Sequence, residues 1–205
     1  MHSVKHTERA ERFARAAAHL FAHQGYRGTS TREIARLAGI AENTLFRYFE
    51  SKEKLFWAAL SVSLAGWEVR PDLAEDLKAN RSPEQVLPRL VAQVVDTTLL
   101  RPELMRLIAV AFLEMGGKAA EVCRPPLAPL LDAVNRYLAA RCEESGQKNL
   151  DPVILTGAIV TTALFSGVLG ELIDGSPPPR SRNRETIDAV SGFWTGVLVP
   201  AGKAG

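Results

Sequence analysis

Cysteine is scarce in this sequence, and residues with the spacing of a known catalytic motif are absent. The two cysteines, Cys123 and Cys142, lie far apart and form no CxxC pair, which fits a reducing cytoplasm where both thiols act as small buried apolar groups. Glycine-rich nucleotide loops, nucleophile elbows, zincin helices and paired-carboxylate motifs are also missing. We therefore predict no enzyme activity, no catalytic residues and no cofactor.

The four histidines do not indicate a metal site either. His19 and His23 are four residues apart, a spacing that can present two ligands to zinc. However, periodicity turns His19 to the polar face of its helix, and no convergent Cys, Asp or third His is apparent in the sequence. We therefore predict that the protein binds no metal.

Long uncharged runs are almost absent. After the charged N-terminal residues there is no apolar stretch, so we expect no secretory signal. Residues 153–170 form one run of 18 residues without a charge, which is the usual threshold for a membrane span. That run contains threonine, serine and three glycines, and it is flanked by Asp151 and Glu171 instead of basic residues. We predict a helix buried on several sides, with no membrane partner, in a cytoplasmic protein.

Alternation with period two is also rare, whereas apolar residues recur at spacings of three and four, so we predict an all-α fold. Hydrophobic residues make up 46% of the chain and charged residues 23%, which is typical of a packed core. Capping boxes and first-turn prolines mark the helix starts. About nine helices are predicted, at residues 7–24, 31–38, 42–49, 52–69, 83–99, 102–115, 126–144, 152–173 and 183–199. Three prolines in the run 174–182 predict an extended linker.

The net charge of +2 is unevenly distributed. Residues 1–60 hold ten of the 25 basic residues but only six of the 23 acidic ones, so this segment is positive and the rest of the chain is slightly negative. A polyanionic partner is therefore expected to bind the first quarter of the chain.

The second and third predicted helices are short and are joined only by Gly39-Ile40-Ala41. With the first helix as a brace, they have the pattern of a helix-turn-helix whose second helix fits a major groove. Periodicity turns Leu45 and Phe49 inward and leaves Asn43 and Arg47 at the centre of the outer face. We therefore predict that residues 1–50 form a DNA-binding domain.

We expect Arg47 to bond guanine and Asn43 to bond adenine, because their side chains match those base edges. Thr44 and Tyr48 would position the helix, and Phe46 would contact sugar or a thymine methyl group. Backbone phosphates would be held by Thr29, Thr31 and Lys52. The full predicted set is Thr29, Thr31, Arg32, Asn43, Thr44, Phe46, Arg47, Tyr48 and Lys52.

The segment GYRGTSTREIARLAGIAENTLFRYFESKEKL, residues 25–55, resembles the TetR-type transcriptional regulators. The matching residues include Gly25, Tyr26, Thr29, Ser30, Ile34, Ala35, Ala38, Gly39, Ile40, Thr44, Leu45, Phe46, Tyr48, Phe49, Lys52, Glu53 and Leu55. The resemblance implies a three-helix N-terminal domain followed by a larger C-terminal helical domain, residues 51–205, for ligand binding and dimerisation.

Three residues depart from the family's pattern. Ala41 stands where a serine N-cap is usual, and its loss costs about 0.5–2 kcal/mol. Phe46 replaces a tyrosine, which removes one expected phosphate contact. Glu42 replaces a basic residue; it helps the helix dipole, and it either accepts from cytosine or repels DNA.

The resemblance also implies a mostly apolar pocket for a small ligand in the middle helices. The candidates there are Trp67, Met105, Phe112, Met115 and Tyr137, although most residues of this kind are ordinary core. Glu114 interrupts an apolar run, and it is either a polar group in that cavity or an acid at a helix end or on the surface.

The last two predicted helices, 152–173 and 183–199, carry small residues that permit close approach and apolar residues at spacings of three and four. The resemblance implies that they pair with their symmetry mates in a homodimer; packing within one chain is the alternative. The candidate interface residues are Gly157, Thr161, Gly167, Ile187, Val190 and Trp194.

The leading hypothesis is a dimeric, sequence-specific transcriptional regulator, a repressor released from a palindromic operator by a small apolar ligand. A helical small-molecule binding protein or enzyme with a degenerate DNA-binding head is an alternative, for which Ala41, Glu42 and Phe46 are the only hints. A ligand-independent architectural DNA binder is a third reading, which the small positive charge disfavours.

Overall fold

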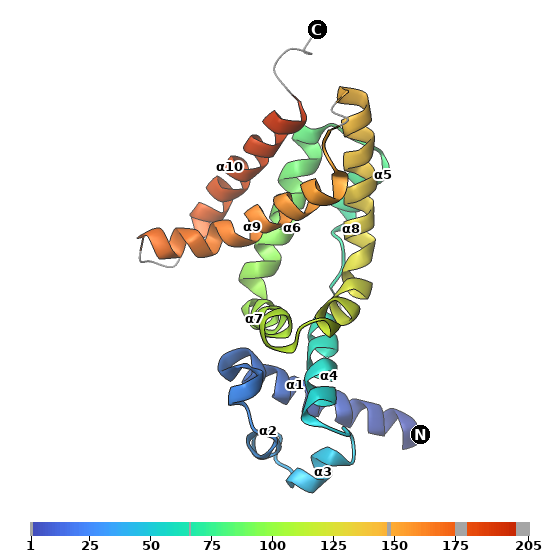
Figure 1. Ribbon diagram of the computed structural model, residues 1–205, viewed down its shortest axis with the longest axis vertical. Coiled ribbons are helices and arrows are strands. Elements are labelled where there is room, and N and C mark those ends of the chain that lie inside the picture. Colours follow the sequence, from blue (N-terminus) through green and yellow to red (C-terminus); the bar gives the residue numbers. More distant parts are fainter. Residues whose placement is uncertain (1, 66, 147–148, 175–179, 200–205) are drawn as a thin grey trace. The chain divides into compact units, whose positions relative to one another are not determined.

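The computed structural model of the protein (Figure 1) describes residues 2–65, 67–146, 149–174 and 180–199, without the side chains of residues 2–5, 99, 167–174 and 180–182. The described residues form ten α-helices and one π-helical turn and contain no strand, which confirms the all-α prediction. Among them, no helix is both long enough and apolar enough to span a bilayer. Most of the predicted linker, residues 175–179, lies outside the described residues.

The chain packs as two compact units, each assembled from two segments. Unit 1 contains Met1–Trp67 and Arg101–Leu127, and unit 2 contains Glu68–Leu100 and Ala128–Gly205. The predicted DNA-binding segment, residues 1–50, lies entirely in unit 1. The predicted boundary after residue 50 separates a DNA-binding domain from a ligand-binding and dimerisation domain, and it does not coincide with the limits of the two packing units. This division stays a prediction.

Unit 1 is built around its first helix. Its elements are α1 (His2–Gly28), α2 (Thr31–Leu37), α3 (Glu42–Phe46), α4 (Lys52–Leu64), α7 (Pro102–Val110), the π-helical turn η1 (Ala111–Met115) and the start of α8 (Lys118–Ser145). Helix α1 packs against α4 and α7, and α2 contacts both α1 and α3. Phe13, Phe21 and Phe56 fill the core of this unit. Burial of these large side chains holds the short helices α2 and α3, which are too short to be stable alone.

Helix α1 is interrupted at Gly25, one residue after the predicted helix end. Gly25 has φ 74° and ψ 173°, a backbone region that is essentially restricted to glycine. The Glu114 carboxylate of η1 accepts hydrogen bonds from the amides of Tyr26 (3.3 Å) and Arg27 (3.0 Å). A Cβ atom on residue 25 would lie 2.6 Å from Glu114 Oε1. Glu114 is therefore a capping group for the end of α1, so it serves at a helix end.

Unit 2 contains α5 (Pro71–Lys78), α6 (Pro83–Leu100), the remainder of α8, α9 (Pro152–Asp174) and α10 (Arg180–Leu198). Helix α6 packs against α5, α9 and α10. Helix α5 was not predicted from the sequence. It buries Leu73 and Leu77, and its buried Asp76 pairs with Arg81 and Arg89. Two features of the sequence could have indicated this helix: Pro71 in its first turn and the spacing of four between the two leucines.

Helix α8 begins at Lys118, whereas the prediction placed its start at residue 126. Pro125 and Pro126 lie inside the helix. The preceding turns bury Ala119 and Cys123, with 0% and 4% of their surface exposed, in the core of unit 1. We attribute the earlier start to this burial, which offsets the backbone hydrogen bonds that proline cannot make. Both cysteines are free and buried, as expected, and burial raises the pKa of each thiol.

Candidate nucleic-acid interface

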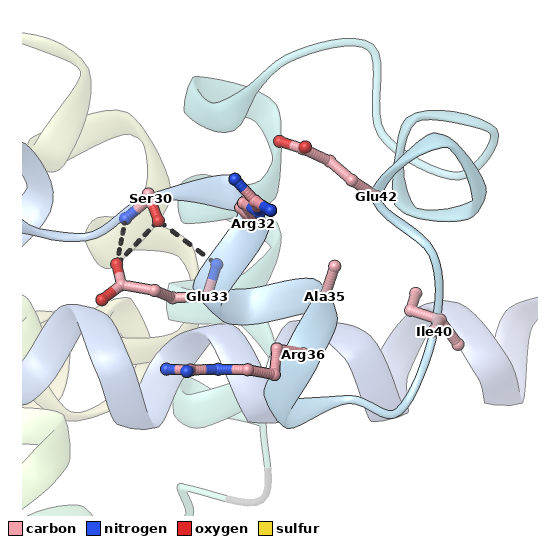
Figure 2. Close-up of a pocket in the computed structure, with 7 residues that line it drawn as sticks. All are labelled: Ser30, Arg32, Glu33, Ala35, Arg36, Ile40 and Glu42. Atoms are coloured by element: carbon pink, nitrogen blue, oxygen red, sulfur yellow. Dashed lines mark hydrogen bonds between the residues drawn. The ribbon is translucent and has the colours of Figure 1, made fainter.

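Helix α2 begins with a complete capping box, as predicted. The Ser30 hydroxyl accepts from the Glu33 amide (3.2 Å), and the Glu33 carboxylate accepts from the Ser30 amide (3.0 Å) and from the Ser30 hydroxyl (2.7 Å). Figure 2 shows these bonds beside a surface hollow. The hydrogen bonds from Ser30 lower the pKa of the Glu33 carboxyl. The start of α2 is thereby fixed relative to the end of α1.

The link between α2 and α3 is tight. Gly39 has φ 68°, which is the left-handed helix end expected there. The Ile40 amide donates to the Ala35 carbonyl at 3.0 Å and the Gly39 amide donates to the Arg36 carbonyl at 3.2 Å. These bonds and the short link join the two helices into a compact helix-turn-helix.

Helix α3 starts without a side-chain cap, because Ala41 occupies the N-cap in an extended conformation. The Glu42 carboxylate in its first turn accepts from the Thr31 hydroxyl at 2.6 Å. This bond joins α3 to the start of α2. Glu42 therefore has a structural role, which is to connect α3 to α2 through the Thr31 hydroxyl.

The outer face of the helix-turn-helix is polar and accessible. Arg32, Asn43 and Arg47 are exposed, and Thr44 is partly buried. Phe46 is 44% exposed, so it is available for an apolar contact. A hollow of about 550 Å³ lies beside this face, and Figure 2 shows its lining residues. They are Ser30, Arg32, Glu33, Ala35, Arg36, Ile40 and Glu42.

Helix α3 is shorter than predicted, since it ends at Phe46 instead of residue 49 and Arg47 is its C-cap. The chain still turns beyond it, because the Tyr48 and Phe49 amides both donate to the Leu45 carbonyl (3.0 and 3.1 Å). The Tyr48 ring packs edge-on against Phe13, with ring centres 5.1 Å apart. This packing keeps Tyr48 at the edge of the exposed face.

Thr29 and Lys52 were predicted to hold phosphates, and the structure gives both side chains contacts within the protein. Thr29 is only 2% exposed, and its hydroxyl donates to the carbonyls of Gly25 (2.8 Å) and Leu20 (3.3 Å). Its side chain is therefore buried and bonded within the protein, in place of the predicted contact to phosphate. Lys52 is half-buried, and its ammonium lies 4.4 Å from the centre of the Tyr26 ring.

The five candidate pocket residues do not fall in one unit. Met105 and Met115 pack against the core of unit 1, and Phe112 is 53% exposed. Trp67 is half-buried at the end of the first segment of unit 1, whereas Tyr137 is buried in unit 2.

A groove of about 740 Å³ lies between α5 and α8 in unit 2. Apolar side chains make up most of its lining, with Lys78 and Arg136 as its cations. Tyr137 lines it too, and its buried hydroxyl has no hydrogen-bond partner among the described residues. Burial raises the pKa of this hydroxyl, so it stays a neutral donor. The lining residues are Val69, Ala74, Leu77, Lys78, Asn80, Pro129, Ala133, Arg136, Tyr137 and Ala140.

The predicted interface helices show an exposed face and a buried one. Gly157 and Thr161 are exposed on α9, as a partner surface requires, and the surroundings of Gly167 lie outside the described side chains. On α10, Val190 is 8% exposed within the single chain, so it packs inside the protomer and is unavailable to a partner. Ile187 and Trp194 are half-buried. The sequence pattern did not reveal that Phe193, which is 63% exposed, occupies the outer face of α10 instead.

Two short helices joined by a tight turn, braced by α1 and followed by a helical body, define the helix-turn-helix class of DNA-binding folds. The model of a family described as bacterial regulatory proteins, tetR family, matches residues 14–59. The protein is also 32% identical over 129 residues to the HTH-type transcriptional repressor NicS of Pseudomonas putida, covering 54% of this chain and 58% of NicS. Residues 14–59 of the chain are thus similar to the matching segment of the tetR-family regulators.

Solved structures extend the likeness of fold over most of the chain. The HlyIIR mutant protein matches with a TM-score of 0.65 and 22% identity, covering 91% of this chain and 98% of that one. AibR in complex with isovaleryl coenzyme A and operator DNA matches with a TM-score of 0.62 and 17% identity, covering 94% of this chain and 98% of that one. By sequence, however, the chain spans less than two thirds of the length of the curated relatives it matches.

Proposed function

We propose that this protein is a cytoplasmic, sequence-specific repressor of transcription that binds a palindromic operator as a homodimer and leaves it when a small ligand binds. The observation that carries this proposal is the exposed set of Arg32, Asn43 and Arg47 on a tightly connected helix-turn-helix. These side chains match phosphate and base edges in a major groove. The similarity to a named repressor supports the same function.

The proposed DNA contacts are a revised form of the predicted set. Asn43 and Arg47 read bases, Phe46 contacts sugar or a thymine methyl group, and Thr44 and Tyr48 position the helix. Arg32 contacts phosphate, while Thr31 acts through its bond to Glu42. Lys52 binds phosphate only if its ammonium leaves the Tyr26 ring. The Thr29 side chain is excluded because it is buried.

The proposed dimer forms through the outer faces of α9 and α10. Ile154, Gly157, Thr161 and Phe165 recur on α9 at spacings of three and four, and all four are exposed. Phe193 lies between Gly192 and Gly196 on α10, and it is exposed together with Gly192. The glycines permit two helices to approach closely, and the apolar side chains beside them are removed from water when the helices associate. A twofold dimer would present its two α3 helices about 34–36 Å apart, as successive major grooves require.

The groove between α5 and α8 is the proposed effector site. Its apolar lining suits a hydrophobic ligand, while Lys78 and Arg136 suit an anionic group on that ligand. A polar atom of the ligand would accept from the buried Tyr137 hydroxyl and so relieve the cost of leaving it unpaired. AibR, which shares this fold, binds isovaleryl coenzyme A, an acidic thioester, in its complex with operator DNA. That example supports an acidic amphipathic effector here.

Selection of bound sequences from a random DNA pool tests the DNA-binding part of this proposal. We expect enrichment of a single palindrome with two half-sites about one helical turn apart. Specific complexes should form with that sequence at moderate salt, where sequence-independent binding is weak. Less than about tenfold discrimination against random DNA would contradict a specific regulator and favour an architectural role.

The effector part is tested separately with the selected operator. Amphipathic acids and thioesters are screened for binding to the purified protein, and each binder is then added to the operator complex. We expect operator affinity to fall, because a ligand shifts an equilibrium through its different affinities for two states. A ligand that binds in the groove and leaves operator affinity unchanged would refute the coupling.

A further inference from the structure

Three side chains from two helices of unit 1 converge at a place that the DNA-binding proposal does not use. His19 and His23 lie on α1, and Glu103 lies on α7, which packs against α1. His19 Nδ1 is 2.8 Å from Glu103 Oε1, and His23 Nε2 is 3.3 Å from the same oxygen. All three ligand atoms lie within 4.8 Å of one another. A third potential ligand, a glutamate that the sequence did not point to, therefore approaches the two histidines.

The arrangement fits the coordination chemistry of zinc and related ions. Two imidazole nitrogens and one carboxylate oxygen are a common open ligand set, with water in the fourth position. Tetrahedral zinc at bond lengths of about 2.0–2.1 Å would place its ligand atoms roughly 3.3–3.4 Å apart. The two nitrogen–oxygen separations are at or below that value, and the site as a whole is no wider than 4.8 Å. Rotamer adjustments of exposed side chains can therefore complete the site without moving either helix.

The site is accessible to an ion from solution. The side chains of His19, His23 and Glu103 are 54%, 42% and 49% exposed. This exposure leaves room for the water ligand and for exchange of the ion. It also means that the two contacts of Glu103 with His19 and His23, taken as surface ion pairs, contribute little to stability.

Arg106 opposes metal binding at this site. Its guanidinium donates to His23 Nδ1 at 3.2 Å. Because arginine can only donate, Nδ1 must accept and the neutral ring carries its proton on Nε2. When a metal ion binds Nε2, the proton of the neutral ring must be on Nδ1 instead. Nδ1 can then no longer accept a hydrogen bond from Arg106, so the guanidinium must move away. Its positive charge also repels the ion.

We propose that His19, His23 and Glu103 form a binding site for a divalent transition-metal ion of the zinc type. The ion joins α1, which braces the helix-turn-helix, to α7, which leads directly into the Glu114 turn. Two imidazoles and one carboxylate favour Zn²⁺, Ni²⁺ or Cu²⁺ over Mg²⁺, which prefers an all-oxygen shell. The site therefore fastens together two helices that are far apart in the sequence.

The test is a titration of the full-length protein, free of any histidine tag, with Zn²⁺ against a fluorescent chelator. We expect one ion per chain, no competition by Mg²⁺, and a rise in melting temperature on adding Zn²⁺ because the ion binds the folded state. His19→Ala, His23→Ala and Glu103→Gln should each weaken binding by at least about tenfold and remove the melting shift. His6→Ala is the matched control, since it removes a histidine of the same helix outside the cluster, and it should bind normally.

Arg106→Leu provides a test in the opposite direction. Removing the competing cation should tighten Zn²⁺ binding while His19, His23 and Glu103 remain in place. Circular dichroism of each metal-free variant shows whether it is folded, so a lost site is distinguished from a lost fold. Unchanged stoichiometry and affinity in the His19→Ala and Glu103→Gln variants, or a loss in His6→Ala equal to theirs, would overturn the proposal. Absence of any Zn²⁺ binding by the unmodified protein would do so as well.

Discussion

Asn43 lies near the start of α3 and Arg47 at its end, and both side chains are exposed. Both are proposed to read bases, a role that a surface charge without a base contact would not have. We predict that Arg47→Ala relaxes operator specificity at one base pair, at a cost of about 1–3 kcal/mol, because a bidentate contact to guanine is lost. Binding of the operator and of single-base variants, measured by fluorescence anisotropy, gives this difference directly.

Arg15→Ala is the matched control for that experiment. Arg15 lies on α1, where it pairs with Glu11, so its loss removes one exposed charge without touching the helix-turn-helix. It should weaken operator and random DNA alike, and only slightly. If Arg47→Ala shows the same equal losses, its role in reading a base is wrong.

A second prediction concerns the backbone at Gly25. We expect Gly25→Ala to lower the free energy of unfolding by about 1–3 kcal/mol, because its φ and ψ are essentially restricted to glycine. The new Cβ would also press on Glu114 Oε1. Urea denaturation measures the loss.

Gly28→Ala isolates the cause of that effect. The nearest atom to a Cβ on Gly28 is Gln24 Cβ at 3.6 Å, which is ordinary van der Waals contact. We therefore expect little change in stability from this variant. Equal destabilisation by the two substitutions would show that Gly25 has no special role.

The individual DNA contacts were only partly predictable from the sequence. Periodicity identified the outer face of α3, since Asn43 and Arg47 are accessible and Leu45 is buried. It could not show that Thr29 turns inward, because that depends on hydrogen bonds from its hydroxyl to the carbonyls of Gly25 and Leu20 in α1. Nor could it reveal Glu103 beside His19 and His23, since that residue lies on another helix some 80 positions away.

The ends of α2 and α3 show how much a single cap contributes to a short helix. Ala41 already has the extended conformation of an N-cap, with φ −72° and ψ 144°. We predict that Ala41→Ser raises the free energy of unfolding by about 1 kcal/mol, since a hydroxyl can accept from an open amide in the first turn. Thermal denaturation provides the measurement.

Ser30→Ala is the reciprocal variant. It removes the hydroxyl that accepts from the Glu33 amide, so it should lower stability by a similar amount, about 1 kcal/mol. Opposite signs for the two variants are the expected pattern. If Ala41→Ser does not raise the free energy of unfolding, a side-chain cap for the first-turn amides of α3 adds nothing to stability.

Among whole helices, those with clear apolar periodicity and a start signal were predicted well, and α6 and α9 begin where expected and end within a residue of expectation. Helix α5 was missed because only two of its apolar residues are spaced to indicate a buried face. The start of α8 was misplaced because the burial of Ala119 and Cys123 depends on residues far away in the sequence and leaves no local start signal.

For the assembled protein, the proposed dimer makes a direct prediction. Phe193→Glu should convert it to a monomer, because a charge would replace an apolar side chain at the centre of a closely packed interface. Analytical ultracentrifugation gives the mass in solution. Operator affinity should also fall, since one α3 alone contacts only a half-site.

Leu113→Glu is the control for this substitution. Leu113 is even more exposed than Phe193, at 86%, but it lies on η1 in unit 1. The same change of apolar side chain to carboxylate there should leave the mass unchanged. A Phe193→Glu protein that remains a dimer would exclude the outer face of α10 from the interface.

The Glu114 cap has a practical consequence for building chimeric regulators. The amides of Tyr26 and Arg27 obtain their acceptor from a carboxylate nearly 90 positions later in the chain. A graft of Met1–Trp67 alone onto a foreign body would leave this acceptor behind, together with the Arg101–Leu127 segment that completes unit 1. Specificity should therefore be transplanted by exchanging side chains on α2 and α3, or by moving both segments together.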